Sequence, residues 1–401
     1  MTDTDLLIVG AGLAGLPIAM ACAQVGWRVA VVDKNERLEV VPTNPLDQRC
    51  TAIGSASENL LRAWGVWDVI ANEVQAIQHV HVSQRGHLGA VRLSAEELNV
   101  SALGYVFENR QWVAALSEHL ELCESHVGHY ANISIHRGES VASVNDEAEG
   151  HVSVGLTSGK SITTRLLIGA DGVNSRVRDL VGVGDEHVDY EQCAFLSTVE
   201  VSQPHRSQAC ERFTSSGPLA LLPRPGQFMS LVWCVASTDA RNLSELNDEE
   251  VIAQLQNLFG FRLGRIKALG PRTVLPLIRR EATRQVGTRT VLLGNAARLL
   301  HPVAGQGFNL ALRDVACLLD AMGRGDHDNA RDPGAVSVLN QFVTARVRDQ
   351  NQVVTLTDVL AKTFRGEARL PGHVRGLALA GLDSFGPARK AFAKRTMGYT
   401  G

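Results

Sequence analysis

The sequence lacks the cysteine spacing of a zinc site or of a disulfide framework. Its seven cysteines are scattered, and no two of them form a CxxC pair. This pattern favours a reducing, cytoplasmic compartment. The thirteen histidines show no metal-ligand spacing either, so no metal site is expected. The net charge of −3 provides no basic field, which argues against nucleic acid as a partner.

Long apolar runs are also scarce, and only the run from Leu6 to Ala23 approaches the length of a membrane span. Asp3 and Asp5 precede this run, whereas a signal peptide would begin with basic residues. Three glycines and Pro17 interrupt it. A strand, a turn and a buried helix therefore explain the run better than a membrane-spanning segment does.

The remaining composition is that of a globular protein, with 45% hydrophobic and 20% charged residues. A chain of 401 residues is too long for one small core, so two or three packed regions are expected. Patterning predicts strands at 6–9, 29–32, 134–136, 152–156, 166–168 and 290–293, and helices at 14–25, 55–70, 110–124, 248–259 and beyond 323. Alternating runs at 78–93 and 194–235 predict an antiparallel sheet inserted into an α/β framework.

The first motif is Gly10-Ala-Gly12-Leu-Ala-Gly15, between a predicted strand and a predicted helix. Gly10 permits a tight turn, Gly12 lets the backbone approach a pyrophosphate, and Gly15 lets the helix pack against the sheet. The N-terminus of that helix offers free N–H groups to phosphates. Asp33 ends the second strand, where a carboxylate can bind both ribose hydroxyls and disfavours a 2′-phosphate. The motif predicts FAD or NAD rather than NADP.

Two later segments repeat the order of strand, turn and helix. One runs from Leu167 through Asp171-Gly172 to Arg178, and the other from Val291 through Gly294-Asn295 to Asp314. An NAD-only dehydrogenase does not need three such segments. They therefore favour FAD over NAD as the bound dinucleotide.

The three segments resemble the GxGxxG, DG and GD motifs of the flavoprotein aromatic monooxygenases with the p-hydroxybenzoate hydroxylase fold. Within that family, nearly the whole chain resembles the ubiquinone-biosynthesis hydroxylases, and most of all the 2-polyprenyl-6-methoxyphenol hydroxylases. Besides the motifs, the resemblance rests on the stretches 81–87, 211–214, 217–220, 230–234 and 294–314.

This resemblance implies an α/β fold: an FAD-binding Rossmann-like βαβ domain with an inserted antiparallel-sheet substrate domain, plus a C-terminal helical region. The expected boundaries are 1–75, 101–182 and 283–330 for the discontinuous FAD-binding domain, 76–100 and 183–282 for the substrate-binding sheet domain, and 331–401 for the helical region.

The resemblance also implies roles for the residues that match the family's motifs. Asp33 would bind the adenosine ribose, Arg49 would lie near the FAD phosphates, and Arg110 would contact FAD at a helix start. Asp171 would serve both FAD and NAD(P)H binding. The residues expected beside the isoalloxazine ring are Pro302, Gly305, Gln306, Gly307, Phe308 and Asn309.

Several of these positions leave alternatives open. Arg49 could be a surface arginine, and Asp171 could also cap the helix that follows it. His301 is a candidate polar group beside the flavin, but a hydrogen-bonded structural histidine is an equal alternative. Asn295 stands where most of the family has an aspartate that accepts a hydrogen bond from the flavin ribityl. The 2-polyprenyl-6-methoxyphenol hydroxylases resemble this chain at that position.

The implied function is hydroxylation of a polyprenyl phenol, 2-polyprenyl-6-methoxyphenol, para to its hydroxyl in ubiquinone biosynthesis. NAD(P)H would bind transiently and reduce FAD, and O₂ would give a C4a-hydroperoxyflavin that oxygenates the ring, so the flavin carries the chemistry. Alternatives are another ring position, another phenol, a flavin dehydrogenase or halogenase, or a noncatalytic FAD-binding module of a biosynthetic complex.

Residues 361–401 contain eight lysines and arginines against Glu367 and Asp383, with leucines and phenylalanines among them. This composition is typical of an interfacial amphipathic helix, and equally of an ordinary solvated helix face. The expectation is peripheral contact with the inner face of the membrane or with other ubiquinone-biosynthesis proteins.

Overall fold

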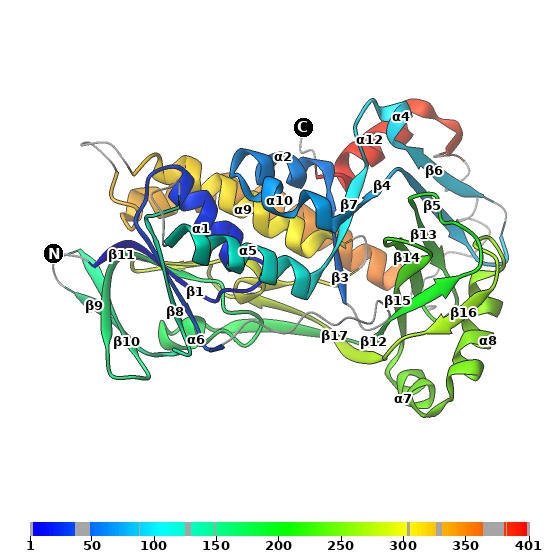
Figure 1. Ribbon diagram of the computed structural model, residues 1–401, viewed down its shortest axis with the longest axis horizontal. Helices are drawn as coiled ribbons and strands as arrows, with labels where there is room; N and C mark the ends of the chain where they lie inside the picture. The colour runs from blue at the N-terminus through cyan, green and yellow to red at the C-terminus, as the bar shows by residue number, and fades with distance from the viewer. Residues whose placement is uncertain are drawn as a thin grey trace.

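The computed structural model describes residues 3–36, 49–87, 89–124, 130–147, 150–302, 305–325, 331–363, 381 and 383–398. In these ranges two large sheets and one small sheet are joined and covered by helices (Figure 1). The fold is mixed α/β, as predicted.

The first large sheet has parallel strands at its centre. In spatial order these are β19 (Thr290–Leu292), β11 (Ser161–Gly169), β1 (Thr4–Val9), β2 (Val29–Asp33) and β8 (Ile133–Arg137). The antiparallel strands are β9 (Val141–Glu147), β10 (His151–Leu156) and β18 (Val286–Gly287). Strands β1, β2 and β19 are almost entirely buried, which explains their continuous apolar sequence.

Helices cover one face of this sheet and build the largest core. They are α1 (Gly15–Gln24), α5 (Asn109–Glu124), α9 (Gln306–Met322) and α10 (Val336–Thr363). Val338, Leu339 and Phe342 of α10 pack into the same hydrophobic cluster as Leu6 and Ile8 of β1. On the other face, α6 (Arg176–Leu180) contributes Val177 to a second cluster with strands β9 and β10.

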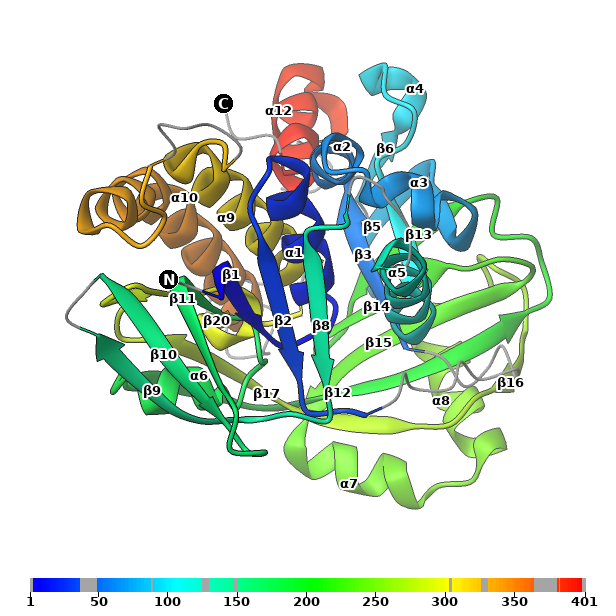
Figure 2. The same ribbon diagram turned by 60° about the vertical axis from the view of Figure 1, so that its left-hand side comes forward.

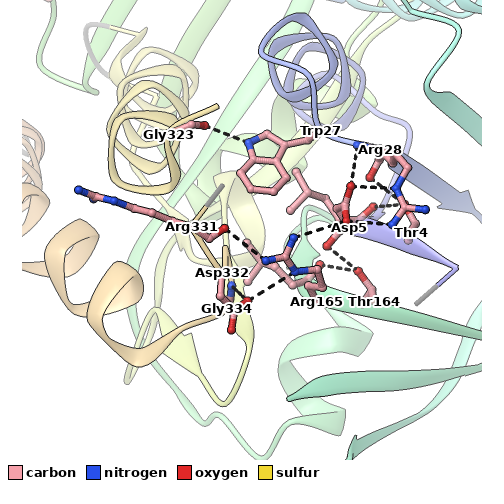
Figure 3. A network of polar contacts seen from close by, with 12 residues as sticks. Thr4, Asp5, Trp27, Arg28, Thr164, Arg165, Gly323, Arg331, Asp332 and Gly334 are labelled. Atoms are coloured by element: carbon pink, nitrogen blue, oxygen red, sulfur yellow. Dashed lines mark hydrogen bonds and ion pairs between the residues drawn. The ribbon is translucent and has the colours of Figure 1, made fainter. Parts of the chain in front are cut away.

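A polar network ties the starts of the central strands to the connection between α9 and α10 (Figure 3). Asp5 of β1 accepts two hydrogen bonds of 3.0 Å from the guanidinium of Arg28. Arg165 of β11 lies 3.7 Å from Asp5 and 3.8 Å from Asp332, so it joins the strands to the residues before α10. Trp27 donates a 3.1 Å bond to the carbonyl of Gly323 at the end of α9. The network fixes α9 and α10 near the amino ends of the central strands. The glycine loop lies at the opposite, carboxyl ends of these strands.

The second large sheet is built mainly from the segments that the sequence assigns to the substrate domain, and its role in substrate binding stays a prediction. Its order is β20 (Arg298–Leu299), β17 (Thr273–Ala282), β12 (Asp185–Val201), β15 (Phe228–Ala236), β14 (Pro218–Pro223), β13 (Gln208–Phe213), β5 (His79–Gln84) and β6 (Ala90–Ser94), and β16 (Ile266–Leu269) pairs with β12. In Figure 2 the long strands β12 and β17 run along the lower side of the molecule.

The prediction of a wholly antiparallel sheet is wrong at one pair, because β13 and β5 run parallel. Sequence alternation identifies a strand but not the direction of its partner. A parallel pair needs a long crossover connection, and here the chain between 84 and 208 returns through the first domain before it forms β13. The hairpin of β5 and β6 is antiparallel, as expected.

One face of the second sheet packs on α7 (Ser237–Glu245) and α8 (Asp248–Phe259). The side chains on this face alternate along the strands, and Phe195, Leu219, Leu231 and Trp233 share a cluster with the two helices. Asn247 and Glu250 form a reciprocal capping box at the start of α8, which explains why this helix begins where the sequence predicts.

The small sheet contains β3 (Cys50–Gly54), β7 (Gly104–Glu108) and β4 (Val74–Ile77). The region predicted to be helical at 55–70 contains two helices, α2 (Ser55–Ala63) and α3 (Val66–Ile70). Gly65 separates them with φ of 71°, and a Cβ there would lie 2.4 Å from Oη of Tyr130. The short helices are η1 (Ala71–Glu73), α4 (Ala95–Leu98) and η2 (Gly294–Ala296).

The helix α12 (Gly386–Thr396) lies beside β6 near the C-terminus (Figure 1). Residues 364–380, which contain Arg365, Arg369 and Arg375, lie outside the described residues. The membrane-contact prediction for 361–401 therefore rests on sequence there. Among the described residues, no helix is both long and apolar enough to cross a bilayer.

Candidate functional site

The three predicted flavin segments meet at the carboxyl ends of β1, β11 and β19, which are neighbours in the sheet. An added Cβ at Gly10 would lie 2.6 Å from the carbonyl oxygen of Ala170, in the second segment. An added Cβ at Gly294 would lie 3.4 Å from Cβ of Ala14, in the first segment. Such close contacts show that segments far apart in the sequence form one site.

The glycines of the first segment serve different purposes. Gly10 has φ of 106° and touches Ala170, and a Cβ at Gly15 would lie 1.7 Å from the carbonyl oxygen of Gly10. Both are therefore required by the fold. Gly12 has no atom within 4 Å of its added Cβ. Its backbone faces open space, which is the opening that a pyrophosphate needs to approach the loop.

Asp33 lies at the end of β2, next to the glycine loop. Its carboxylate accepts a 2.6 Å hydrogen bond from the N–H of Ala11 and a 2.8 Å bond from the N–H of Asn35. Because each carboxylate oxygen can accept two bonds, the side chain keeps acceptor capacity for ribose hydroxyls. The placement fits the role that the sequence predicts.

A cavity of about 520 Å³ runs from the glycine loop to the second sheet. This volume lies in the range of small-molecule and cofactor sites. Four of the predicted site residues line it: Gly12, Asp33, Arg49 and Arg110. Its far wall belongs to the second sheet and the connection before β17, with Leu196, Ser197, Ser230, Leu231, Val232, Pro271 and Thr273.

Positive charge gathers at the glycine-loop end of the cavity, where Arg49, Arg110 and Arg137 line its wall. The nearby carboxylate of Glu108 is engaged as the cap of α5, since it accepts bonds from the N–H groups of Arg110 (3.1 Å) and Gln111 (2.5 Å). Arginine suits phosphate because its planar fork binds two oxygens at once. Glycine backbone, ribose acceptor and arginines together fit the adenosine diphosphate half of FAD.

Asp171 follows β11 and precedes α6, whose N-cap is Ser175. It accepts bonds from Oγ of Ser175 (2.5 Å) and from the N–H of Val177 (3.1 Å). Asp171 therefore helps to cap the helix by holding Ser175 and by binding one N–H of the first turn. A direct contact with FAD or NAD(P)H stays a prediction, since Asp171 does not line the cavity.

Asn309 holds the start of α9 against β3 and α2. Its Oδ1 accepts from the N–H of Gly54 (2.8 Å) and from Oγ of Ser57 (2.7 Å), and its Nδ2 donates to the carbonyl of Gly305 (2.7 Å). The side chain is 4% exposed. The structure thus gives Asn309 a structural role in positioning the 305–309 turn.

The other residues predicted beside the isoalloxazine ring do not line the cavity. Gln306 is buried, whereas Pro302 is exposed and Gly305 and Gly307 are half-buried. Phe308 packs edge-on against Phe107 and Trp112 of the first core. Their contact with the flavin stays a prediction. Val303 and Ala304, in the same motif, lie outside the described residues.

His301 is 1% exposed, and its ring stands edge-on to Tyr190 with centroids 5.1 Å apart. Burial lowers the pKa of His301 to about 4, so it is neutral near pH 7. Tyr190 donates a hydrogen bond to Asp358 of α10, which also pairs with Arg279 at 3.0 Å. This packing favours the structural alternative for His301.

Asn295 is exposed in the turn η2, beside the first segment. It does not line the cavity, so its contact with the ribityl stays a prediction. Sequence reasoning missed Arg137 and Glu108. Arg137 ends β8 in register with Asp33, and only the pairing of β2 with β8 reveals it.

Residues 3–355 match the family model described as FAD binding domain. The chain belongs to this family of FAD-dependent monooxygenases, and the predicted cofactor FAD and the predicted enzyme class are confirmed.

The most informative relatives are ubiquinone-biosynthesis hydroxylases. The chain is 34% identical to ubiquinone hydroxylase UbiL of Rhodospirillum rubrum, over 98% of this chain and 89% of that protein. It is 31% identical to 3-demethoxyubiquinol 3-hydroxylase of Escherichia coli, over 98% of each. HpxO of Klebsiella pneumoniae, solved with FAD, shares the fold, with a TM-score of 0.76 and 17% identity over 98% of each chain.

Proposed function

We propose that this enzyme hydroxylates the aromatic ring of a polyprenyl phenol in ubiquinone biosynthesis, with NAD(P)H as reductant and O₂ as oxygen source. The first candidate is 2-polyprenyl-6-methoxyphenol, hydroxylated para to its hydroxyl. The names of the two relatives given above support the class of substrate.

The observation that carries the proposal is the continuity of the cavity. It joins the phosphate-binding loop at Gly12 to a wall that presents the side chains of Leu196 and Val232. FAD, when bound, supplies the electron transfer and the oxygen activation. The chain's own residues then have to bind the phosphates, exclude water and hold a ring against the flavin.

The two ends of the cavity divide these tasks. Arg49 and Arg110 can bind the negative phosphates, and Asp33 can bind the ribose. The wall of the second sheet carries no charged side chain among its lining residues, and its polar residues are Ser197, Ser230 and Thr273, so it suits an aromatic ring better than a charged group.

A second candidate is 3-demethoxyubiquinol, hydroxylated at position 3. The relative from Escherichia coli that bears this name aligns over 98% of both chains. The cavity wall alone does not separate the two substrates, because both present a substituted ring with a prenyl chain.

The test is oxygen incorporation by purified, FAD-loaded protein. Short-chain analogues of both substrates are incubated with NADH or NADPH under ¹⁸O₂, and the products are identified by mass spectrometry. We expect one analogue to stimulate NAD(P)H oxidation and to gain one ¹⁸O atom, either para to the hydroxyl of the phenol or at position 3 of the quinol. The variant Asp33→Ala at limiting FAD is the matched control, and it should regain activity with excess FAD. NAD(P)H oxidation without an oxygenated product would contradict the proposal.

We also propose peripheral contact with the inner face of the membrane through residues 361–401, because a polyprenyl substrate resides in lipid. Flotation with anionic liposomes compares the wild type with the double variant Lys390→Glu/Lys394→Glu. Both lysines are exposed on α12, and the variant keeps Ala393 and Met397 of the same helix in the core. Failure of the full chain to float would remove this proposal.

A further inference from the structure

One carboxylate lies in the wall of the second sheet that faces the first domain. Four neighbouring strands align Leu196, Val232, Ala220 and Glu211 in one row, because these residues pair in register across β12, β15, β14 and β13. Residues that pair directly across a sheet point to the same face. Leu196 and Val232 line the cavity. Glu211 therefore points to the same face of the sheet as the cavity wall, beyond the residues that line the cavity and two strands or about 10 Å from Val232.

The opposite face of the same strands supports this direction. The residues next to the row, including Cys210, Leu219 and Leu231, are buried against α7 and α8. Along β13, Ala209 and Phe213 point with Glu211 toward the small sheet, where they share a cluster with Cys50 and Ala52 of β3.

Packed protein covers the row only in part. Leu196, Val232, Ala220 and Glu211 are each half-buried, although they lie on strands whose other face is fully covered. Ala52, in the cluster beside Glu211, also lies next to the turn that is predicted to contact the flavin. A Cβ added at Gly305 of that turn would lie 3.9 Å from Cβ of Ala52. Glu211 thus stands across from the segment expected to hold the flavin ring.

Glu211 makes no hydrogen bond or ion pair with the described part of the chain that would account for its carboxylate. Burial raises the pKa of Glu211 to about 7, and no basic group opposes this effect. The titratable groups around this wall are the thiols of Cys234 and Cys50, the carboxylate of Glu108 and the guanidinium of Arg224. Arg224 is engaged with Thr198 at 3.3 Å. On α12, which packs against the same cluster, Arg389 pairs with Glu97 and Asp383.

We propose that Glu211 is a catalytic residue that accepts the hydroxyl proton of the phenol and selects neutral phenols over aromatic acids. The inference rests on the proposed function and names the group that recognises the substrate. A half-buried carboxylate without a positive partner destabilises the fold, and such groups occur where binding or catalysis requires them.

The chemistry needs only a proton transfer at this residue. The O–H bond of the phenol breaks, the proton moves to a carboxylate oxygen of Glu211, and the electron pair stays on the phenol oxygen. That oxygen then donates electron density into the ring, so the carbon para to it becomes the better nucleophile. When the hydroxylated product leaves, the same proton returns to its oxygen, and Glu211 is regenerated.

The same group explains selectivity. If a substrate carried a carboxylate where the phenol carries its hydroxyl, that carboxylate would lie beside the carboxylate of Glu211. Two negative charges so close together are strongly disfavoured away from water. A neutral phenol instead supplies a donor to the carboxylate. The chain should therefore bind prenyl phenols and reject hydroxybenzoates.

The experiment measures ligand binding through the change in the flavin absorbance spectrum of the FAD-loaded protein. The ligands are 2-methoxy-6-prenylphenol, its O-methyl ether, which lacks the hydroxyl proton, and 4-hydroxybenzoate. We expect wild type to bind the phenol at least tenfold more tightly than the ether, and not to bind 4-hydroxybenzoate. Glu211→Gln should lose this preference while its FAD affinity stays within twofold of wild type.

Turnover provides a second measurement. General-base catalysis contributes about 10²–10⁴-fold, so the kcat for hydroxylation by Glu211→Gln should fall at least 100-fold while the KM changes less. In wild type kcat should rise with pH through a pKa near 7, and that limb should disappear in the variant. The matched control is Glu200→Gln, which removes a glutamate of the same sheet that pairs with Lys267 at 3.4 Å. This control should behave as wild type does.

The outcomes separate the two proposals. If wild type binds the phenol preferentially but oxygenates none of the substrates, the proposed function fails and the role of Glu211 in phenol recognition stands. If wild type does not prefer the phenol to the ether, or if Glu211→Gln keeps both the preference and the pH profile, the assignment of Glu211 is overturned.

Discussion

The N–H of Ala11, in the glycine loop, donates a 2.6 Å hydrogen bond to Oδ2 of Asp33 at the end of β2. This bond joins the segment that receives the pyrophosphate to the residue that receives the ribose. Asp33 therefore acts on FAD in two ways, as a ligand and as a support for the loop. A second bond from the N–H of Asn35 holds the same carboxylate at 2.8 Å.

Replacing Asp33 should weaken FAD binding by both routes. A hydrogen bond to a charged group contributes about 1.5–3 kcal/mol, so we expect Asp33→Ala to lower FAD affinity roughly 10- to 100-fold. Asp33→Asn keeps one acceptor oxygen and should lose less. Fluorescence titration of each apoprotein with FAD gives the affinities. Equal affinities for wild type and Asp33→Ala would show that FAD does not contact this residue.

Two glycines of the loop should respond differently to alanine. Gly12→Ala should fold as wild type does, because its added Cβ meets nothing within 4 Å, but it should lower FAD affinity more than tenfold by narrowing the opening. Gly10→Ala should destabilise the protein by about 1–3 kcal/mol or more, because φ is 106° and the added Cβ meets Ala170 at 2.6 Å. Thermal unfolding of the apoproteins and FAD titration separate the two effects. Unimpaired FAD binding by Gly12→Ala would place the pyrophosphate elsewhere.

The sequence was sufficient to predict the parts of the site that depend on local geometry. A glycine pattern between a strand and a helix, followed by an acid at the end of the next strand, places Gly12 and Asp33 in one cavity without knowledge of the sheet order. Helix α8 was equally predictable, since its capping box and its apolar spacing are both local.

The remaining features depend on pairing between distant strands, which one sequence does not reveal. Arg137 reaches the cavity because β8 lies beside β2, and Glu211 joins the far wall through the register of β13 with β14. Glu211 was noticed only as part of a stretch that resembles a family, with no role attached. The parallel direction of β5 and β13 was missed for the same reason.

Substitutions at Asn295 test whether the third flavin segment contacts FAD. Asparagine keeps an acceptor oxygen but lacks the charge of aspartate, and a charge-assisted bond is roughly twice as strong as a neutral one. Removal of a negative charge near the pyrophosphate partly offsets that loss. We expect Asn295→Asp to bind FAD within about tenfold of wild type, a difference below ~1.4 kcal/mol.

Asn295→Ala should cost about 1–3 kcal/mol of FAD affinity, because a ribityl hydroxyl would lose its partner in the bound state. The stability of the apoprotein should change little, since Asn295 is exposed. FAD titration of the three forms decides between a ligand and a turn residue. Wild-type affinity in the alanine variant would assign Asn295 to the turn alone.

Glu211 should also leave a signature in the stability of the ligand-free protein. Burial raises the pKa of Glu211 from its ordinary value of 4.5 to about 7 in the folded protein. Between these two values the folded state holds a proton that the unfolded state releases, so the contribution of this group to stability falls as pH rises from 4.5 to 7 and stays low above 7. Glu211→Gln removes the titrating group. The variant should therefore gain more stability over wild type at pH 8 than at pH 5.

The size of this effect follows from the pKa shift. Each unit is worth about 1.4 kcal/mol, so the stability gain of Glu211→Gln should be about 1–3 kcal/mol larger at pH 8 than at pH 5. Chemical unfolding at the two pH values measures the difference, and Glu200→Gln, at a paired surface position, should show no comparable gain. If Glu211 served only the fold, Glu211→Gln would destabilise the protein at both pH values. Stabilisation confined to the higher pH, together with the loss of phenol recognition, would show that the carboxylate is retained for the substrate at the expense of stability.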